Sequence, residues 1–336
     1  MYHVRFKGTH YEAGFKYGSM LKKNGVIING SPTFEISEEM KLFAAQCLPI
    51  YEEYYPEIIQ EIKGMSDAQD TNMLLYEMLF SMYCFKPEQH CTCFALSNRE
   101  NIVFGRNSDF LVSLEKLNMN CLYSLKDSYA FNGNTTAFIE IEDGMNEHAL
   151  AVGLTFLYPH TRKPGLNAGM LLRYILEKCT TTKEAIKALQ QLPIASAQTF
   201  TIADRTGDIA VVECNPVSLE VIYPCSNNCF VAATNHFNST TLQDYNAPKD
   251  IDTWKSIERY ETVCNAFNSK KNKQVLDFSK DLLSGKYGFI CQYDRKKNAD
   301  TVWSVIYDVK QRKVYRVEGN PSRKIFKEDT RMSFRK

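Results

Sequence analysis

The sequence predicts an α+β fold in which two largely antiparallel sheets pack together and helices cover their outer faces. Up to residue 90, apolar residues recur at the helical period, and from residue 91 onward short apolar runs separated by turn residues dominate. Helical periodicity then returns between the runs, in 165–192, 254–267 and 274–284. Strands flanked by covering helices are typical of a layered architecture with packed sheets.

The composition is that of a globular protein without a strong net charge. The chain has 336 residues, 44% of them hydrophobic, with 40 Lys and Arg against 39 Asp and Glu. This balance supplies no basic field that would attract nucleic acid or an anionic membrane. The N-terminus has no signal-peptide run, and no stretch of about 18 apolar residues follows. We therefore expect a soluble cytoplasmic protein with neither nucleic acid nor membrane as a partner.

Residues 1–90 are expected to be mainly helical. Gly14 and Gly18 stand four positions apart, which lets one helix face pack closely against a neighbour; no phosphate-loop pattern accompanies them. Pro56 suits the first position of a later helix, and Gly64 is the expected end of that helix.

Strands are expected from the segment that begins at Cys91. The candidates are 91–97, 101–106, 136–142, 149–157, 198–204, 209–214, 219–224, 229–234, 301–308 and 312–317. Turn residues lie between them, among others Asn132-Gly133, Asp143-Gly144 and Thr206-Gly207-Asp208, and they predict hairpin connections. The basic tail 322–336 is expected to be solvated surface.

Cysteine is frequent, and the chain has eleven of them. In a reducing compartment most are expected to be small buried hydrophobes. Neither the cysteines nor the six dispersed histidines show the paired spacing of a zinc site, so we expect no metal and no cofactor. Cys93 shares a strand face with Cys91 and is either a second thiol of a site or part of the core.

Cys91 is the candidate nucleophile. A thiol has an ordinary pKa of about 8.5 and reacts well only beside a base or a cation. If the bond between His90 and Cys91 were cut, the new α-amine would supply that base on the same residue. Arg106 and Asp109 follow on the neighbouring expected strand, where their charges would adjust the amine and the thiol. Taken alone, however, Cys91 also fits a buried structural cysteine.

Four stretches together resemble the N-terminal nucleophile hydrolases of the choloylglycine hydrolase and penicillin acyltransferase group. They are His90-Cys91-Thr92-Cys93-Phe94-Ala95, Phe104-Gly105-Arg106-Asn107-Ser108-Asp109, Asp143-Gly144-Met145-Asn146-Glu147 and Ala233-Thr234-Asn235-His236-Phe237. Bile salt hydrolases carry the cysteine directly after the initiator Met, whereas here 90 residues precede it. This long leading segment favours the acyl-coenzyme A:6-aminopenicillanic acid acyltransferase branch.

The resemblance implies a four-layer αββα sandwich with a helical pro-segment. Residues 1–90 would become a small chain and residues 91–336 the catalytic chain, both within one structural domain. Cleavage at the bond between His90 and Cys91 would make Cys91 the N-terminal nucleophile.

The resemblance also implies roles for other positions. Arg106 and Asp109 would line and orient the site, and Asn235 would help bind the oxyanion. Arg259 matches a more distant arginine of the same sites. Thr155 stands in the oxyanion segment, where bile salt hydrolases carry Asn.

The predicted activity is hydrolysis or acyl transfer at a linear amide of a small molecule, and an acyl-coenzyme A donor is compatible with it. Two alternatives stay open. An uncleaved enzyme would pair Cys91 with His236 as its base. A non-catalytic binding protein would keep the fold without using Cys91. Nothing in the sequence fixes an oligomeric state.

Overall fold

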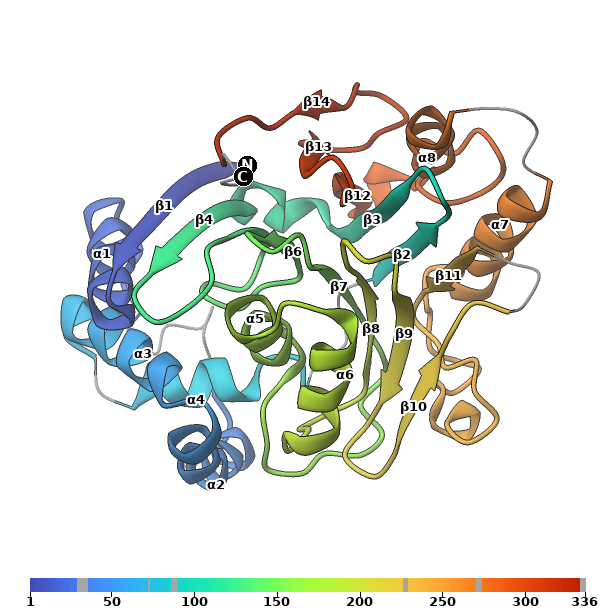
Figure 1. Ribbon diagram of the computed structural model, residues 1–336. Helices are drawn as coiled ribbons and strands as arrows, with labels where there is room; N and C mark the ends of the chain where they lie inside the picture. Colours follow the sequence, from blue (N-terminus) through green and yellow to red (C-terminus); the bar gives the residue numbers. More distant parts are fainter. Residues whose placement is uncertain (29–35, 72, 86–89, 226–228, 270–273, 333–336) are drawn as a thin grey trace.

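The strands of the protein form two sheets in a computed structural model (Figure 1). The structure describes residues 1–28, 36–71, 73–85, 90–225, 229–269 and 274–332. In spatial order, the first sheet contains β1 (Tyr2–Gly8), β4 (Met119–Leu125), β5 (Phe131–Thr135), β6 (Asp143–Asn146), β7 (Ala151–Phe156), β8 (Gln198–Ala203), β9 (Ile209–Cys214) and β10 (Leu219–Ile222). The second contains β11 (Phe230–Ala233), β2 (His90–Ser97), β3 (Ile102–Leu111), β12 (Ala299–Asp308), β13 (Lys313–Val317) and β14 (Lys327–Glu328).

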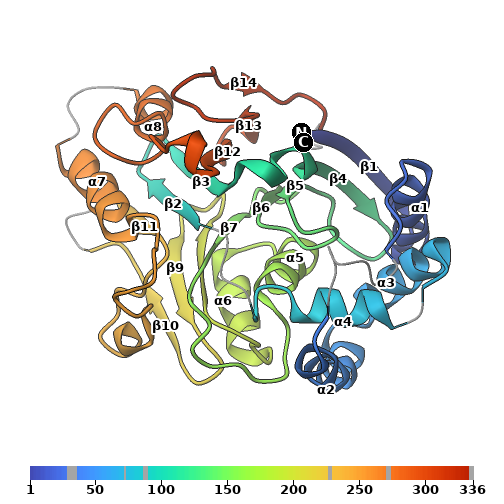
Figure 2. The same cartoon turned by 180° about the vertical axis from the view of Figure 1, so that it is seen from behind.

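Helices cover the outer faces of both sheets and complete four layers, as the view from behind also shows (Figure 2). The helices are α1 (His10–Lys23), α2 (Glu38–Tyr54), α3 (Pro56–Gln69), α4 (Leu74–Ser81), α5 (Ala168–Lys178), α6 (Thr182–Gln191), α7 (Ser256–Asn268) and α8 (Val275–Leu283), with short 3-10 helices at Val112–Leu117, Gln243–Tyr245 and Arg295–Lys297. One apolar core joins α1 to α6 to the first sheet, and another joins α7 and α8 to the second. A third core, which includes Cys93 and Phe104, lies between the sheets. The predicted pair of packed sheets with outer helices is confirmed.

Helices α1 and α3 touch backbone to backbone at their glycines. A Cβ atom at Gly14 would lie 1.8 Å from the Glu61 carbonyl oxygen, and one at Gly64 would lie 2.1 Å from the Tyr11 carbonyl oxygen. The close packing predicted for Gly14 and Gly18 is therefore confirmed. The prediction that Gly64 ends a helix is wrong, because α3 continues past it and α1 approaches too closely there for a side chain.

The N-terminal segment contributes a strand that the sequence does not predict. Strand β1 runs parallel to β4, with Tyr2 opposite Met119, whereas the other strand pairs are antiparallel. Val4 and Phe6 alternate with polar neighbours and are buried. The pairing joins residues more than 100 positions apart, so local spacing contains no signal for it. Strands β4 and β14 are also absent from the sequence prediction.

A buried ion cluster ties the N-terminal segment to the rest of the chain. Arg173 of α5 donates to Glu61 of α3 at 3.0 Å and to Glu177 at 3.0 Å. Glu177 also contacts His10 of α1 and accepts from the Tyr55 hydroxyl. These side chains are buried, so removing one partner would leave charges unpaired away from water.

The region before β7 departs from the sequence prediction. The expected strand 136–142 is a loop, and Phe131–Thr135 just before it form β5. The expected turns Asn132-Gly133 and Asp143-Gly144 lie inside β5 and β6, where Gly133 is opposite Gly144. The site at Gly144 is tightly packed, since a Cβ atom there would lie 2.6 Å from the Leu176 side chain of α5, which would have to shift.

Candidate active site

Cys91 lies at the second position of β2, and its side chain is fully buried. Antiparallel pairing with β3 places Ser108 opposite Cys91 and Arg106 opposite Cys93. Residues diagonal to each other on one face of a ladder are within reach of a long side chain. Arg106 uses this reach, and its Nη2 donates to Cys91 Sγ at 2.7 Å.

Arg106 is held on three sides by groups of the first sheet and the loop before β6. Its Nε donates to the Leu154 carbonyl oxygen at 3.1 Å, and its Nη1 donates to Asp143 Oδ2 at 2.8 Å. The Nη2 that faces the sulfur also lies 3.3 Å from Glu142 Oε2. The guanidinium of Arg106, which comes from the second sheet, is therefore held by groups of the first sheet and faces the thiol.

Asn235 follows β11 and reaches the backbone of Cys91. Its Oδ1 accepts the backbone N–H of Cys91 at 3.0 Å, and its Nδ2 donates to the Phe156 carbonyl oxygen at 2.7 Å. The nitrogen that would become an α-amine after cleavage is thus the atom that Asn235 holds.

Arg259 of α7 contacts the backbone of the same residue from the helical layer of the second sheet. Its Nη1 donates to the Cys91 carbonyl oxygen at 2.6 Å, and its Nη2 donates to Asn235 Oδ1 at 2.8 Å. Arg259 Nη1 also lies 3.8 Å from Asp109 Oδ2. The structure therefore brings Arg259 into direct contact with the candidate nucleophile.

Asp109 is buried near the end of β3, directly opposite His90 of β2. Burial raises the pKa of Asp109 to about 6, although Arg259 and hydrogen bonds from Thr301 and Tyr293 oppose the rise. The Thr301 hydroxyl donates at 2.6 Å and the Tyr293 hydroxyl at 2.9 Å. The carboxylate thus changes its charge close to neutral pH.

Thr155 is near the site but its hydroxyl is engaged elsewhere. It donates to the Thr234 carbonyl oxygen at 2.6 Å and pairs with the Thr199 hydroxyl at 2.7 Å. Within the described residues it has no hydrogen bond to Cys91. The structure therefore pairs the Thr155 hydroxyl with groups of neighbouring strands.

Neither histidine near the site is placed as a base for the thiol. The His90 ring stacks on Trp254 at 4.6 Å between centroids, and burial followed by Arg259 lowers its pKa to about 3. His236 Nδ1 lies 2.8 Å from the Ser256 hydroxyl, and burial and Arg259 lower its pKa to about 4. No hydrogen bond joins His236 to Cys91 in the described part of the chain.

The surroundings of the thiol in the intact chain favour its protonated form. Burial raises the pKa of Cys91 to about 12; Arg106 opposes this rise, and Glu142 adds to it. A single adjacent guanidinium therefore does not produce a thiolate at neutral pH. The arrangement can hold and polarise a thiol, and it requires a separate base to activate it.

Two acidic neighbours of Arg106 escaped the sequence reasoning. The sequence predicts Glu142 in a strand and Asp143 in a turn, whereas both are fully buried and contact Arg106. The sequence contains one signal for this role. The two carboxylates follow the apolar positions Ile139 and Ile141, which indicate a buried segment, and a buried charge needs a partner.

Cys93 faces the intersheet core, and its Sγ lies 3.8 Å from the Leu154 carbonyl oxygen.

Among the described residues, no group of three or more His, Cys, Asp or Glu side chains has the arrangement of a metal site. In the same residues, no helix combines the length and apolar character that crossing a membrane requires.

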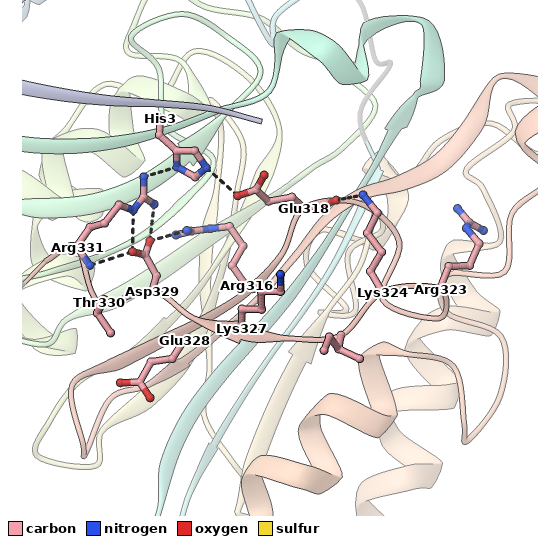
Figure 3. Close-up of a pocket in the computed structure, with 11 residues that line it drawn as sticks. His3, Arg316, Glu318, Arg323, Lys324, Lys327, Glu328, Asp329, Thr330 and Arg331 are labelled. Atoms are coloured by element: carbon pink, nitrogen blue, oxygen red, sulfur yellow. Dashed lines mark hydrogen bonds and ion pairs between the residues drawn. The ribbon is translucent and has the colours of Figure 1, made fainter.

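A hollow of about 990 Å³ lies near the C-terminus, and none of the site residues described above lines it (Figure 3). Two of its three lining arginines are paired inside the hollow, since Asp329 accepts from both Arg316 and Arg331. Arg331 also donates to Asn120 of β4 at 2.6 Å, so the tail expected to be solvated surface is anchored at this point. Residues 333–336 of that tail lie outside the described residues.

Comparison with known proteins gives a family match. A family model described as acyl-coenzyme A:6-aminopenicillanic acid acyl-transferase matches residues 96–323, a range that contains Arg106, Asp109, Asn235 and Arg259. Cys91 lies just before the matched range.

Solved structures show similarity at low sequence identity. An ortholog of N-acylethanolamine-hydrolyzing acid amidase from Caenorhabditis elegans is 18% identical at a TM-score of 0.48, over 66% of this chain and 93% of that one. A penicillin V acylase from Agrobacterium tumefaciens is 14% identical at 0.45, over 68% and 82%. A conjugated bile acid hydrolase variant from Clostridium perfringens is 16% identical at 0.46, over 68% and 89%.

Proposed function

This chain belongs to the acyl-coenzyme A:6-aminopenicillanic acid acyl-transferase family, and on that premise we propose that it is an autoprocessing cysteine amidohydrolase or acyltransferase. It would act on a linear amide of a small molecule through an acyl thioester on Cys91. The observation that carries the proposal is the convergence of Arg106 on the sulfur, Asn235 on the nitrogen and Arg259 on the carbonyl oxygen of this one residue.

Maturation would be an attack of Cys91 on the peptide bond before it. The thiol sulfur adds to the carbonyl carbon of His90, the C–N bond breaks, and the nitrogen leaves with the thiol proton as an α-amine. Water then hydrolyses the thioester, which gives a carboxylate on His90 and a free thiol. The His90 side chain is fixed on Trp254, which supports a defined position for the bond that breaks.

Turnover would use the new amine as the base. The amine takes the thiol proton, the thiolate adds to the substrate carbonyl, and Asn235 Nδ2 is the proposed donor to the oxyanion. As the C–N bond breaks, the proton passes to the leaving amine. Water or an acceptor amine then attacks the thioester and returns the proton to the thiol. The free α-amine has an ordinary pKa of about 7.7–8.0, which suits proton transfer near neutral pH.

Intact-mass measurement and N-terminal sequencing of the purified protein test the proposal. We expect a chain that begins at Cys91 together with a chain of residues 1–90, and hydrolysis of at least one of penicillin V, an N-acylethanolamine or a conjugated bile acid. Cys91→Ala should remain a single 38.6 kDa chain without activity. Full activity of Cys91→Ala in an uncut chain would overturn the proposal.

Two rival functions give different outcomes. An uncut enzyme that uses His236 as its base predicts that His236→Ala abolishes acyl-enzyme formation while no new N-terminus appears. The hydrogen bond of His236 to Ser256 speaks against this rival. A binding protein predicts that a thiol-reactive probe modifies Cys91 no faster than the other ten cysteines.

A further inference from the structure

Asp143 accepts four hydrogen bonds from buried side chains around the site. It lies at the start of β6, is fully buried, and both of its carboxylate oxygens accept hydrogen bonds. Oδ2 accepts from Arg106 Nη1 at 2.8 Å and from Trp303 Nε1 at 2.9 Å. Oδ1 accepts from the Tyr307 hydroxyl at 2.6 Å and from Asn134 Nδ2 at 2.5 Å. The carboxylate is therefore fixed by groups from β3, β5 and β12.

Trp303 contacts Arg106 directly as well as Asp143. Its ring lies 5.4 Å from the guanidinium carbon of Arg106, in the geometry of a cation–π contact. The same indole donates to Asp143, so one side chain holds both partners of the ion pair. With Nε bound to the Leu154 carbonyl oxygen, the guanidinium has little freedom to rotate.

We propose that Asp143 is a positioning residue, which fixes the guanidinium of Arg106 so that Nη2 faces the Cys91 sulfur. The inference rests on the proposed function, in which Cys91 is the nucleophile. Asp143 contacts Nη1 of Arg106, whereas the sulfur contacts Nη2, so Asp143 holds the cation without competing for Nη2. Glu142 does compete, because its Oε2 lies 3.3 Å from that same nitrogen.

The charged and titratable groups around the thiol determine what a substitution should do. They are Arg106, Asp109, Glu142, Arg259, Cys93, Tyr83 and the neighbouring His90, together with the α-amine of Cys91 in the processed protein, which every variant below shares. If Asp143 acts only through its charge, Asp143→Asn should lower the pKa of the thiol, because a nearby negative charge disfavours a thiolate. If Asp143 positions Arg106, the freed guanidinium turns toward Glu142 and the pKa rises. The two explanations predict opposite signs.

The test measures how the rate of iodoacetamide modification of Cys91 in the processed protein depends on pH, with the modified peptide identified by mass spectrometry. For Asp143→Asn we expect the profile to shift to higher pH and the rate at neutral pH to fall about tenfold, as a shift of one pKa unit produces. Glu142→Gln should shift the profile to lower pH. Asp300→Asn is the matched control: it is also buried and paired with Arg295 and Arg323, and among the described residues it has no contact with Arg106.

Three outcomes would overturn the inference. Asp143→Asn could leave the profile unchanged, could shift it downward as Glu142→Gln does, or could shift it no more than Asp300→Asn. If Asp143→Asn does not fold, Tyr307→Phe keeps all charges and removes one hydrogen bond to Asp143, and the expected shift is smaller but in the same upward direction. An unshifted profile for Tyr307→Phe would then contradict the inference. An unreactive Cys91 in the unsubstituted protein would instead contradict the proposed function.

Discussion

The side-chain oxygen of Asn235 links Arg259 to the backbone of Cys91, the candidate nucleophile. The Oδ1 of Asn235 accepts from Arg259 Nη2 at 2.8 Å and from the backbone N–H of Cys91 at 3.0 Å. The cation therefore fixes the amide group that holds the reacting residue. It also directs Asn235 Nδ2 toward the Phe156 carbonyl oxygen.

Asn235→Ala should slow cleavage of the bond between His90 and Cys91, and amide turnover, on the order of 10²–10³-fold, the cost of losing one oxyanion donor. Cleavage is followed by gel electrophoresis after synthesis. Asn238→Ala is the control, because its side chain contacts Glu213 instead. Equal cleavage rates in the two variants would contradict a role for Asn235.

Asp109 should make the folded state less stable as pH rises. Its folded pKa of about 6 is above the ordinary value of 3.8, so the folded chain binds this proton more tightly than the unfolded chain. The resulting stabilisation is fully present below pH 3.8 and is lost as pH rises through about 6. Asp109→Asn cannot ionise and should gain stability relative to the parent between these pH values, by an amount on the order of 1–3 kcal/mol.

Urea unfolding of both proteins across this pH range measures the difference in the free energy of unfolding. Asp250→Asn, at an exposed position, controls for the loss of one carboxylate. A stability difference between Asp109→Asn and the parent that does not change with pH would refute the prediction.

Much of the architecture is predictable from the sequence because it depends on local patterns. From residue 91 onward, apolar residues alternate with polar ones or form short continuous runs, as in β2 and β12. This local spacing is typical of strands and identifies them. Strand β1 and its parallel pairing with β4 depend on a contact across the chain, which no local pattern encodes. Asp143 was missed for a related reason: its glycine neighbour is typical of a turn, while its role depends on Arg106 of another strand.

The glycine contact between α1 and α3 should tolerate no side chain. Gly14→Ala would place its Cβ atom 1.8 Å from a backbone oxygen, so the helices must move apart. We expect a loss of about 1–3 kcal/mol in the free energy of unfolding, the usual cost of overpacking. Chemical denaturation measures it, and Ser19→Ala on the same helix is the control. A Gly14→Ala protein as stable as the parent would show that the helices adjust without cost.

Glu177 should make the protein sensitive to acid. Burial acts to raise its pKa, but pairing with Arg173 and His10 outweighs burial and lowers the pKa to about 2. A lowered folded pKa gives stability that is present above the ordinary value of 4.5 and is lost as pH falls toward 2.

The segment 1–90 should therefore dissociate from the processed protein between about pH 4 and 2, the window in which a carboxylate with this shift takes up its proton. Size-exclusion chromatography detects the separation. Glu177→Gln should be less stable than the parent at pH 7, and its remaining stability should depend less on pH in the acid range. Glu220→Gln on β10 controls for the loss of a carboxylate, and identical acid profiles for parent and Glu177→Gln would contradict this prediction.

The parallel pair of β1 and β4 has a consequence for the lifetime of the processed protein. Before cleavage, β1 is covalently linked to the sheet whose edge it covers, so folding is unimolecular. After the proposed cut, recovery from denaturation requires two separate chains to find each other, and its yield depends on protein concentration. Dilution would then slow reassembly, and the edge of β4 would stay uncovered and open to pairing with another chain for longer. The mature protein would be held in its active form by slow unfolding rather than by reversible equilibrium, and each molecule would effectively fold once.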